Sequence, residues 1–240
     1  MNNPLWAQDS AEAMSLLQLW HQQVKQHHLE TFRGVGLQKF PQDLWLYERL
    51  LWEVKPTVVF EVGVNQGGFS LWLAERLRSI QLHQLASANA SQRPTPGVRV
   101  VGIDIDISNA QANLVHHADL ASYICFEQVD AAHASALTEM AQRYVSSEDS
   151  VLVIEDSAHI YATTMASLVA LAPLVSLNSY FIVEDGCVDF EHLRECEQWP
   201  RGVMQAVQDF LLTHPEFVQD SIGDCYTITC HPGGFLRRIV

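Results

Sequence analysis

The chain has 240 residues, with 14 Lys and Arg against 28 Asp and Glu, so its formal net charge is −14. Apolar residues make up 48% of it, the fraction of a globular protein, which excludes a wholly disordered chain. The excess of acid argues against nucleic acid and against an anionic membrane surface as partners, because both attract basic proteins. Charged residues are only 18% of the chain, against about 25% in typical domains, which favours a homo-oligomer, although a well-filled core gives the same value.

The cysteines and the first residues bear on where the protein works. Five cysteines are scattered without a CxxC pair, a pattern typical of reduced thiols in a cytoplasmic protein. The beginning of the chain lacks the basic and apolar regions of a signal peptide. No apolar run approaches the roughly 18 residues of a membrane span. We therefore expect a cytoplasmic protein without a membrane anchor.

The first quarter of the chain predicts helices. Apolar residues at helical spacing predict a helix over Ser10–His28, with Ser10 as its N-cap. Residues 29–42 contain two glycines and a proline, so we expect a loop there. A second helix is predicted over about Asp43–Glu53. Residues 1–55 are thus expected to form a lid or interface segment, ahead of a single domain at 56–240.

From residue 56 onward, short apolar runs alternate with helical patterns. The runs predict five strands, at 58–62, 98–103, 123–128, 150–155 and 180–183. Helices are predicted at 68–80, 109–121, 134–144, 161–175 and 201–213, and a surface excursion at 81–97. This alternation is typical of a parallel sheet that is covered on both faces.

The end of the chain predicts an antiparallel hairpin. Two strand-like segments, Tyr226–Cys230 and Phe235–Ile239, flank the turn sequence His231-Pro-Gly-Gly234. The predicted fold is therefore α/β, with a mostly parallel seven-stranded sheet, helices on both faces and a C-terminal hairpin at the sheet edge.

Glycines follow the first strand of this sheet. Ligands of such sheets bind at the carboxyl ends of the strands, near the point where strand order reverses. Gly63, Gly67 and Gly68 allow a backbone to approach a ligand and expose amides at a helix N-terminus. Asn65 stands where a dinucleotide site usually has its second glycine. Glu61 is an acid inside an apolar strand, which is costly without a partner.

Acids follow the second and third strands. Asp104 and Asp106 end the second strand, where a carboxylate can accept hydrogen bonds from ribose hydroxyls, and Asp130 follows the third, where it can contact a base. Taken singly, the glycines could serve only the turn, and Asp104 could cap the next helix. Together they favour a nucleoside-containing ligand. With no cradle for a pyrophosphate, S-adenosylmethionine (SAM) fits better than NAD.

A second polar cluster follows the fourth and fifth strands. Asp156 ends one and Glu184 and Asp185 end the other, and these strands should be neighbours. Three carboxylates this close repel one another unless a cation lies between them, and hard oxygen ligands suit Mg²⁺ or Mn²⁺. His159, three residues after Asp156, is a candidate general base. Acids at helix N-termini are also favourable singly, so a structural role stays open for each.

One pattern suggests iron and is rejected. His117-Ala-Asp119 with a later His has the residue types of a 2-His-1-carboxylate site. These residues fall in a predicted helix, where side chains two residues apart point in different directions.

Six motifs in order resemble one known family. They are residues 36–48, Lys55-Pro56, Glu61-Val-Gly63 with Gly67-Gly68, Gly102-Ile-Asp104-Ile-Asp106, Asp156-Ser-Ala-His159 and Val183-Glu184-Asp185. Over about residues 30–240 the chain resembles the cephalosporin hydroxylase / rhamnosyl O-methyltransferase family. The resemblance implies a Rossmann-like class I methyltransferase fold, SAM, a divalent metal, natural-product hydroxyls as acceptors and frequent oligomers. Macrolide-sugar O-methyltransferases, which look related, place a metal-ligand Asp and a base His at the DxxH spacing of Asp156 and His159. The chain departs from the family at residues 81–97 and at Cys187.

The sequence therefore predicts a SAM-dependent, Mg²⁺-assisted O-methyltransferase of a small natural product, with 56–240 as the catalytic domain. Asp156, Glu184 and Asp185 would hold the metal, and His159 or Asp156 would take the acceptor's proton. Two alternatives stay open: a non-catalytic scaffold that binds a nucleoside, and an NAD-dependent oxidoreductase, which the missing middle glycine disfavours.

Overall fold

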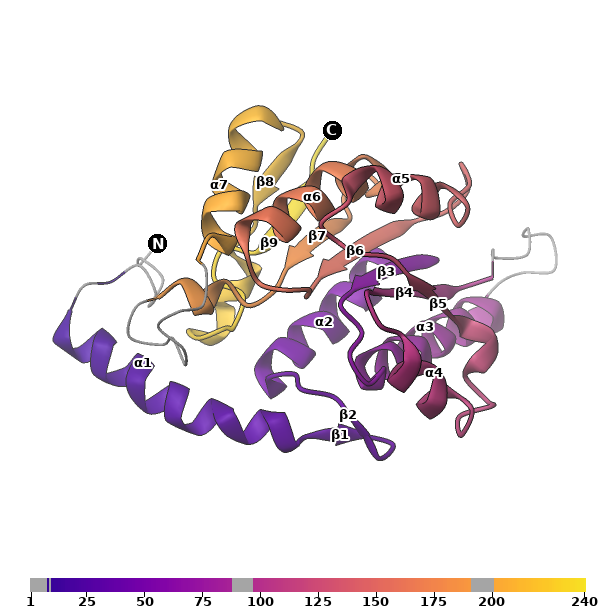
Figure 1. The fold of residues 1–240 in the computed structure, drawn as a ribbon, viewed down its shortest axis with the longest axis horizontal. Coiled ribbons are helices and arrows are strands. Elements are labelled where there is room, and N and C mark those ends of the chain that lie inside the picture. Colours follow the sequence, from indigo (N-terminus) through magenta and orange to yellow (C-terminus); the bar gives the residue numbers. More distant parts are fainter. Residues whose placement is uncertain (1–7, 9, 88–96, 191–200) are drawn as a thin grey trace.

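In the computed structural model, which describes residues 8, 10–87, 97–190 and 201–240, a seven-stranded sheet lies between two layers of helices (Figure 1). Its strands are β3 (Val58–Val62), β4 (Arg99–Asp104), β5 (Ile124–Gln128), β6 (Val151–Glu155), β7 (Tyr180–Val183), β8 (Phe217–Gln219) and β9 (Phe235–Arg238). Their order is β5-β4-β3-β6-β7-β9-β8, with the first five parallel and β9 antiparallel to both neighbours. The predicted mostly parallel, seven-stranded α/β sheet is confirmed.

The centre of the sheet decides where a ligand can bind. The chain moves outward from β3 to β4 and β5, then returns to place β6 on the other side of β3. Val62 of β3 pairs with Ile103 of β4 and with Glu155 of β6. The residues that follow these strands, Gly63 and Asp156 among them, therefore meet at one edge of the sheet, at the point where strand order reverses.

Helices cover both faces of the sheet because its strands are apolar on both sides. One face carries α2 (Pro41–Val54) and α3 (Gly68–Ser87), and the other carries α5 (Ala134–Gln142), α6 (Tyr161–Leu171) and α7 (Val203–Thr213) (Figure 1). Alternate residues of β3 supply the two cores: Val59 packs with the first layer, and Val58 and Phe60 pack with the second. This double burial explains the uninterrupted apolar runs in the sequence.

The N-terminal segment lies along the edge of this layered body. Helix α1 (Ala11–Val24) continues into a 3-10 turn at Lys25–Leu29. Its Leu17 and Trp20 are buried, and they belong to a small apolar cluster that also contains Phe40 and Cys230. The predicted loop at 29–42 contains a short antiparallel hairpin, β1 (Thr31–Phe32) and β2 (Val35–Gly36), and α2 begins at Pro41.

Two predicted helix bounds are wrong. Helix α3 continues to Ser87, so the first part of the predicted excursion at 81–97 is helical, and residues 88–96 lie outside the described residues. The ring of His83 contacts Trp52 of α2 at a centroid distance of 5.4 Å, so packing continues along this extension. Helix α4 (Ser108–Leu114) ends seven residues before the predicted end, and turns and a 3-10 helix at Ala121–Tyr123 follow.

The predicted C-terminal antiparallel hairpin is confirmed, but its predicted first strand is wrong. β9 pairs antiparallel with β8 on one side and with β7 on the other, and Tyr226–Cys230 contains no strand. The physical reason is Asp43 of α2, whose carboxylate accepts hydrogen bonds from the Thr229 hydroxyl (2.6 Å) and the Cys230 amide (2.9 Å). These contacts hold the segment as a loop against α2 instead of in the sheet.

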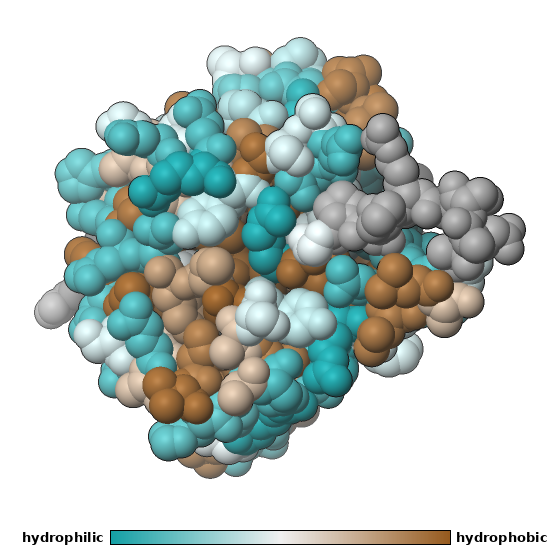
Figure 2. All heavy atoms as spheres, turned by 90° about the vertical axis from the view of Figure 1, so that its right-hand side faces the viewer, coloured by the Kyte–Doolittle hydropathy of each residue, from teal (hydrophilic) through white to brown (hydrophobic). Residues whose placement is uncertain are grey.

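The surface gives no single apolar face in the view of Figure 2, where hydrophobic residues form separate patches between hydrophilic ones. Within the described part of the chain, no helix has the length and apolar character needed to cross a membrane. Homo-oligomer formation and a cytoplasmic location stay predictions, as does the division into segments 1–55 and 56–240.

Candidate active site

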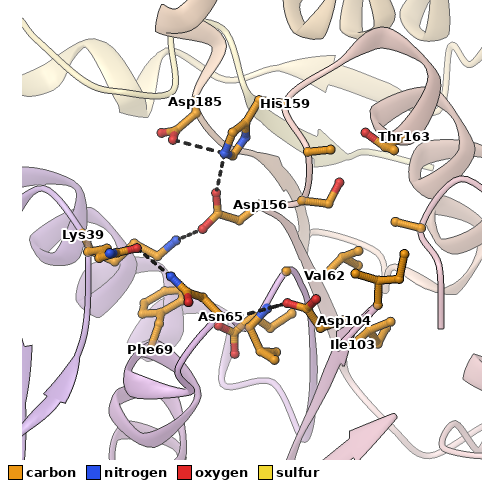
Figure 3. A pocket seen from close by; sticks show the side chains of 18 of the residues that line it. Lys39, Val62, Asn65, Phe69, Ile103, Asp104, Asp156, His159, Thr163 and Asp185 are labelled. Carbon is orange, nitrogen blue, oxygen red and sulfur yellow. Dashed lines mark hydrogen bonds and ion pairs between the residues drawn. The ribbon is translucent and has the colours of Figure 1, made fainter. Parts of the chain in front are cut away.

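A cavity of about 440 Å³ opens at the carboxyl edge of the sheet (Figure 3). Eight of the site residues predicted from the sequence line it: Glu61, Gly63, Asn65, Asp104, Asp130, Asp156, His159 and Asp185. They come from five different strand ends, which the parallel sheet brings to one edge. Gly67, Gly68, Asp106 and Glu184 were also predicted, but they are not part of this lining.

Asp104 shapes the turn that follows β3. Its Oδ2 accepts hydrogen bonds from the backbone amides of Val64 (2.9 Å) and Asn65 (3.1 Å). Its Oδ1 accepts from the Asp106 amide (3.2 Å), and the Asp106 carboxylate in turn accepts from the amide of Ser108 (2.9 Å), the first residue of α4; no side chain caps this helix at its N-cap residue, Ile107. The end of β4 thus fixes the turn through one acid and begins the next helix with the other.

Two of the glycines permit close backbone contacts. Gly63 has φ +95°, and a Cβ there would come within 1.9 Å of the Asp156 carbonyl oxygen. A Cβ on Gly68 would come within 2.1 Å of the Gly36 carbonyl oxygen. Gly63 therefore joins the first turn to the acidic cluster, and Gly68 lets the β1–β2 hairpin cross the start of α3.

Asn65 connects the same turn to the N-terminal segment. It adopts a left-handed backbone, with φ +48°, and its side-chain amide donates to the Gln38 side-chain oxygen (2.7 Å). Gly36, Leu37, Gln38 and Lys39 all line the cavity. Part of the segment expected to be a lid or an interface therefore forms one wall of the site.

Glu61 lies buried in β3, beneath the cavity. Burial raises the pKa of its carboxyl to about 8, although a hydrogen bond from the Ser70 hydroxyl favours the charged form. Ser70 is the partner that the sequence analysis required for an acid inside an apolar strand.

Asp156, His159 and Asp185 converge at the other end of the cavity. The Nε2 of His159 lies 3.8 Å from Asp156 Oδ1 and 3.7 Å from Asp185 Oδ2 (Figure 3). His159 has a left-handed backbone, with φ +52°, two residues before the start of α6. One ligand atom from each of these three residues lies within 4.8 Å of the others, a spacing that could hold a metal ion.

Burial and the charges of neighbouring groups together shift the pKa values of these three residues. Burial, and then the negative charge of Glu184, raise the pKa of Asp156 to about 7. Burial lowers the pKa of His159, but Asp185 and Asp156 raise it, and the net shift is upward. Burial raises the pKa of Asp185, but His159 and His231 lower it, and the net shift is downward. The cluster therefore carries excess negative charge that a cation would stabilise.

Lys39 is a site residue that the sequence analysis did not identify. Its ammonium contacts Asp156 and Glu184, the latter at 2.5 Å, and lies 4.6 Å from the centre of the Phe69 ring. Glu184 is buried, and its other oxygen accepts a hydrogen bond from the Tyr47 hydroxyl (2.5 Å). The available sequence signal was the motif at 36–48, which contains Lys39 and Tyr47.

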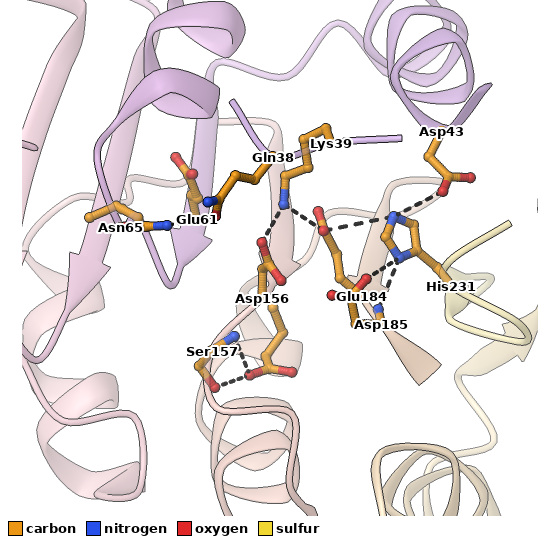
Figure 4. Close-up of polar contacts among 12 residues, drawn as sticks. Gln38, Lys39, Asp43, Glu61, Asn65, Asp156, Ser157, Glu184, Asp185 and His231 are labelled. Atoms are coloured by element: carbon orange, nitrogen blue, oxygen red, sulfur yellow. Dashed lines mark hydrogen bonds and ion pairs between the residues drawn. The ribbon is translucent and has the colours of Figure 1, made fainter. Parts of the chain in front are cut away.

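His231 forms a second layer behind the acids (Figure 4). Its Nδ1 accepts a hydrogen bond from the Asp185 amide (3.0 Å), and its Nε2 lies 3.7 Å from both Asp43 and Glu184. The loop between β8 and β9 thereby fixes the position of Asp185. No motif pointed to this histidine as a site residue.

His117 and Asp119 form no metal site. Asp119 pairs with Arg33 (2.9 Å) and Arg78 (3.5 Å) at the surface. The predicted helix on which the rejection of an iron site rested is wrong here, because α4 ends at Leu114 and both residues lie in the turns after it; the metal-compatible groups found among the described residues include neither of them.

Comparisons with known proteins agree on the family. A family model described as Rhamnosyl O-methyltransferase/CmcI matches residues 24–239. A rhamnosyl O-methyltransferase from Mycobacterium tuberculosis is 24% identical over 214 residues, which are 87% of this chain and 78% of that protein. A namesake from Mycobacterium leprae is 25% identical over 156 residues, 65% of this chain and 59% of that protein.

Solved structures share the fold. A structure of CmcI with Mg and SAM superposes with a TM-score of 0.61 at 22% identity, covering 89% of this chain and 78% of that one. An O-methyltransferase from Bacillus cereus, in complex with SAH, gives 0.56 at 13% identity, covering 88% and 84%. At these identities the likeness establishes the fold, so the chemistry has to be argued from the site itself.

Proposed function

This chain belongs to the rhamnosyl O-methyltransferase/CmcI family, and we propose that it is a SAM-dependent, divalent-metal-assisted O-methyltransferase that acts on a hydroxyl of a small natural product, such as a sugar or a polyketide. One observation carries the proposal: a single cavity joins the turn after β3 to the cluster of Asp156, His159 and Asp185. The first half suits a nucleoside cofactor, and the second suits a cation and a proton acceptor.

The first half of the cavity fits SAM better than a dinucleotide. Asp104 and Asp130 line the ends of β4 and β5, where they can bind ribose and base. The described lining contains no arginine, and its one lysine, Lys39, is already paired with Asp156 and Glu184. This environment suits a cofactor with a sulfonium and an amino group better than it suits a pyrophosphate.

The second half fits a hard divalent cation. The ammonium of Lys39 already lies between Asp156 and Glu184, so this position accepts positive charge. Asp156, Glu184 and Asp185 supply carboxylate oxygens, the ligands that Mg²⁺ and Mn²⁺ prefer. We assign these three residues to the metal, with Asp156 and Asp185 on the cavity wall and Glu184 behind Lys39.

Residues of the chain would position the acceptor hydroxyl and take its proton. When bound, a Mg²⁺ ion would lower the pKa of an acceptor hydroxyl and orient it. His159 or Asp156 would take the hydroxyl proton. Asp185 and Asp156 raise the pKa of His159, so a cation that neutralised them would lower this pKa and leave more of the imidazole unprotonated and able to accept the proton. The segment from Gly36 to Lys39 would hold the cofactor end closed, and this positioning supplies much of the acceleration.

Ligand binding and turnover test the proposal separately. S-adenosylhomocysteine (SAH), NAD and ATP are compared by thermal shift, and only SAH should stabilise the protein. Methyl transfer from radiolabelled SAM to a panel of glycosides and polyketides is then measured with and without EDTA. We expect activity that EDTA removes and Mg²⁺ restores. Stabilisation by NAD but not SAH would contradict the cofactor assignment, and full activity in EDTA would contradict the metal.

His159→Ala separates catalysis from the scaffold alternative. Loss of a general base lowers turnover by about 10²–10⁴-fold while SAH binding is kept. A protein that binds SAH but transfers no methyl group to any acceptor tested, in the wild type as in the variant, would favour the scaffold.

A further inference from the structure

Two cysteines that the proposed reaction does not use meet beside Asp185. The Sγ atoms of Cys187 and Cys230 and a carboxylate oxygen of Asp185 all lie within 4.8 Å of one another. Cys187 follows the end of β7 by four residues, and Cys230 precedes β9, so the fold joins two distant segments here. Both cysteines are free thiols.

The backbone holds this group in place. The Cys187 amide donates to the Cys230 carbonyl oxygen (3.1 Å), and the Asp185 amide donates to His231 Nδ1 (3.0 Å). Two adjacent residue pairs therefore connect the segment after β7 to the loop before β9. Trp20 and Leu17 of α1 belong to the same apolar cluster as both cysteines. The three ligand atoms are thus preorganised before any ion arrives.

The donor set differs in kind from the carboxylates of the proposed Mg²⁺ site. Thiolate sulfur binds Zn²⁺ and similar soft ions, whereas Mg²⁺ prefers oxygen. Asp185 lines the cavity and its side chain is 33% exposed, which provides a path for an ion. We infer that Asp185, Cys187 and Cys230 form a second metal site, for a thiophilic divalent ion such as Zn²⁺, with a fourth position left for water.

The two metal sites would share one ligand. An ion held by the cysteine pair would engage Asp185, which the proposed function assigns to Mg²⁺. This competition for Asp185 rests on the proposed function. If it occurs, Zn²⁺ should inhibit methyl transfer in the wild type. Inhibition should be weaker in Cys187→Ser, which leaves Asp156, Glu184 and Asp185 intact.

Cobalt spectroscopy tests binding without any assay of activity. Protein that has been reduced, freed of metal and kept anaerobic is titrated with Co²⁺, whose bonds to thiolates give an intense charge-transfer absorption in the near ultraviolet. We expect this band in the wild type, its loss in Cys187→Ser and in Cys230→Ser, and its displacement by Zn²⁺. Asp185→Asn should weaken Co²⁺ binding.

The matched control removes the other thiols. A variant with Cys125→Ser, Cys196→Ser and Cys225→Ser keeps only the pair; Cys125 and Cys225 are exposed, and Cys196 lies outside the described residues. It should retain the band. A wild type without the band, or a band that survives in both Cys187→Ser and Cys230→Ser, would overturn the site. If SAH fails to bind but the band appears, the metal site stands and the proposed function falls.

Discussion

Glu61 makes stability depend on pH in a way that a single substitution can isolate. Its folded pKa of about 8 lies above the ordinary value of 4.5, so the folded state holds this proton more tightly than the unfolded state. The stabilisation from Glu61 is complete below the pKa that its carboxyl has in the unfolded state. It is lost as the pH rises through the pKa of the folded state, and each pKa unit of difference is worth about 1.4 kcal/mol.

We therefore expect Glu61→Gln to flatten the pH dependence of the unfolding free energy. The amide keeps an acceptor for Ser70 but cannot ionise. Urea unfolding at about pH 5.5 and about pH 8.5 should show a smaller loss of stability in Glu61→Gln than in the wild type. The exposed Glu30→Gln is the control and should follow the wild type. If the unfolding free energies of Glu61→Gln and the wild type changed with pH in parallel, Glu61 would not be the source of this pH dependence.

Lys39 compensates the buried negative charge of the site. Lys39→Met leaves Glu184 and Asp156 without their cation, and removal of one partner from a buried ion pair typically costs about 3–5 kcal/mol. Mg²⁺ should recover part of this loss, because it would supply the missing positive charge. Thermal unfolding with and without Mg²⁺ measures both effects, and the exposed Lys55→Met is the control. This account would be contradicted if Lys39→Met were as stable as the wild type. It would also be contradicted if Mg²⁺ stabilised the variant no more than it stabilises the wild type.

The residues of the acidic cluster were accessible to sequence reasoning only in part. Asp156 and Asp185 directly follow neighbouring parallel strands, so pattern and topology together placed them at one edge. Lys39 reaches Asp156 across 117 positions of sequence. That contact depends on how the segment after β2 crosses the sheet edge, which no local periodicity determines. His231 was missed for the same reason, because it arrives from the loop before β9.

At the scale of elements, the sequence predicted the buried strands best. β3 and β6 are buried along their whole length, so each is an apolar run apart from one buried acid, Glu61 in β3 and Glu155 at the end of β6. β8 has three residues, too few for a pattern to emerge. Tyr226–Cys230 is strand-like in sequence, but Thr229 is buried there to contact Asp43. A side-chain hydrogen bond to a distant helix holds this segment as a loop, and its own residues do not reveal that contact.

Gly68 joins two elements, and its replacement tests how tightly the wall of the cavity is fixed. In Gly68→Ala the new methyl group would meet the Gly36 carbonyl oxygen at 2.1 Å, a backbone contact that has to move. Overpacking of this kind costs about 1–3 kcal/mol. Hydrogen exchange at β1 and β2 should become faster, and SAH affinity should fall because residues 36–39 line the cavity.

Gly97→Ala is the matched control for this substitution. A methyl group there would meet no atom within 4 Å, so stability should change by less than about 0.5 kcal/mol. If Gly68→Ala leaves exchange at β1–β2 and SAH affinity as they are in the wild type, the hairpin tolerates displacement and is not a fixed wall.

The order of the sheet separates the two halves of the site across the whole molecule. β4, which ends at Asp104, and β7, which Asp185 follows by two residues, are three strand positions apart, or about 14 Å at the usual strand spacing. Groups at such distances with no shared partner usually act additively. The cofactor and metal functions should therefore respond to different substitutions.

Asp104→Ala and Asp185→Asn should accordingly have opposite effects on the binding of SAH and of Mg²⁺. SAH at 100 times its dissociation constant adds about 2.7 kcal/mol of stability. Asp104→Ala should abolish most of that gain, because it releases the amides of Val64 and Asn65 that shape the turn. Asp185→Asn should keep the gain from SAH and lose affinity for Mg²⁺, measured by titration calorimetry. Asp106→Ala, which removes the carboxylate bonded to the Ser108 amide at the start of α4, controls for damage near the turn and should keep both ligands. If each substitution weakened the binding of SAH and of Mg²⁺ equally, the strand ends would form one coupled site. The separation of cofactor and metal binding inferred from sheet order would then be wrong.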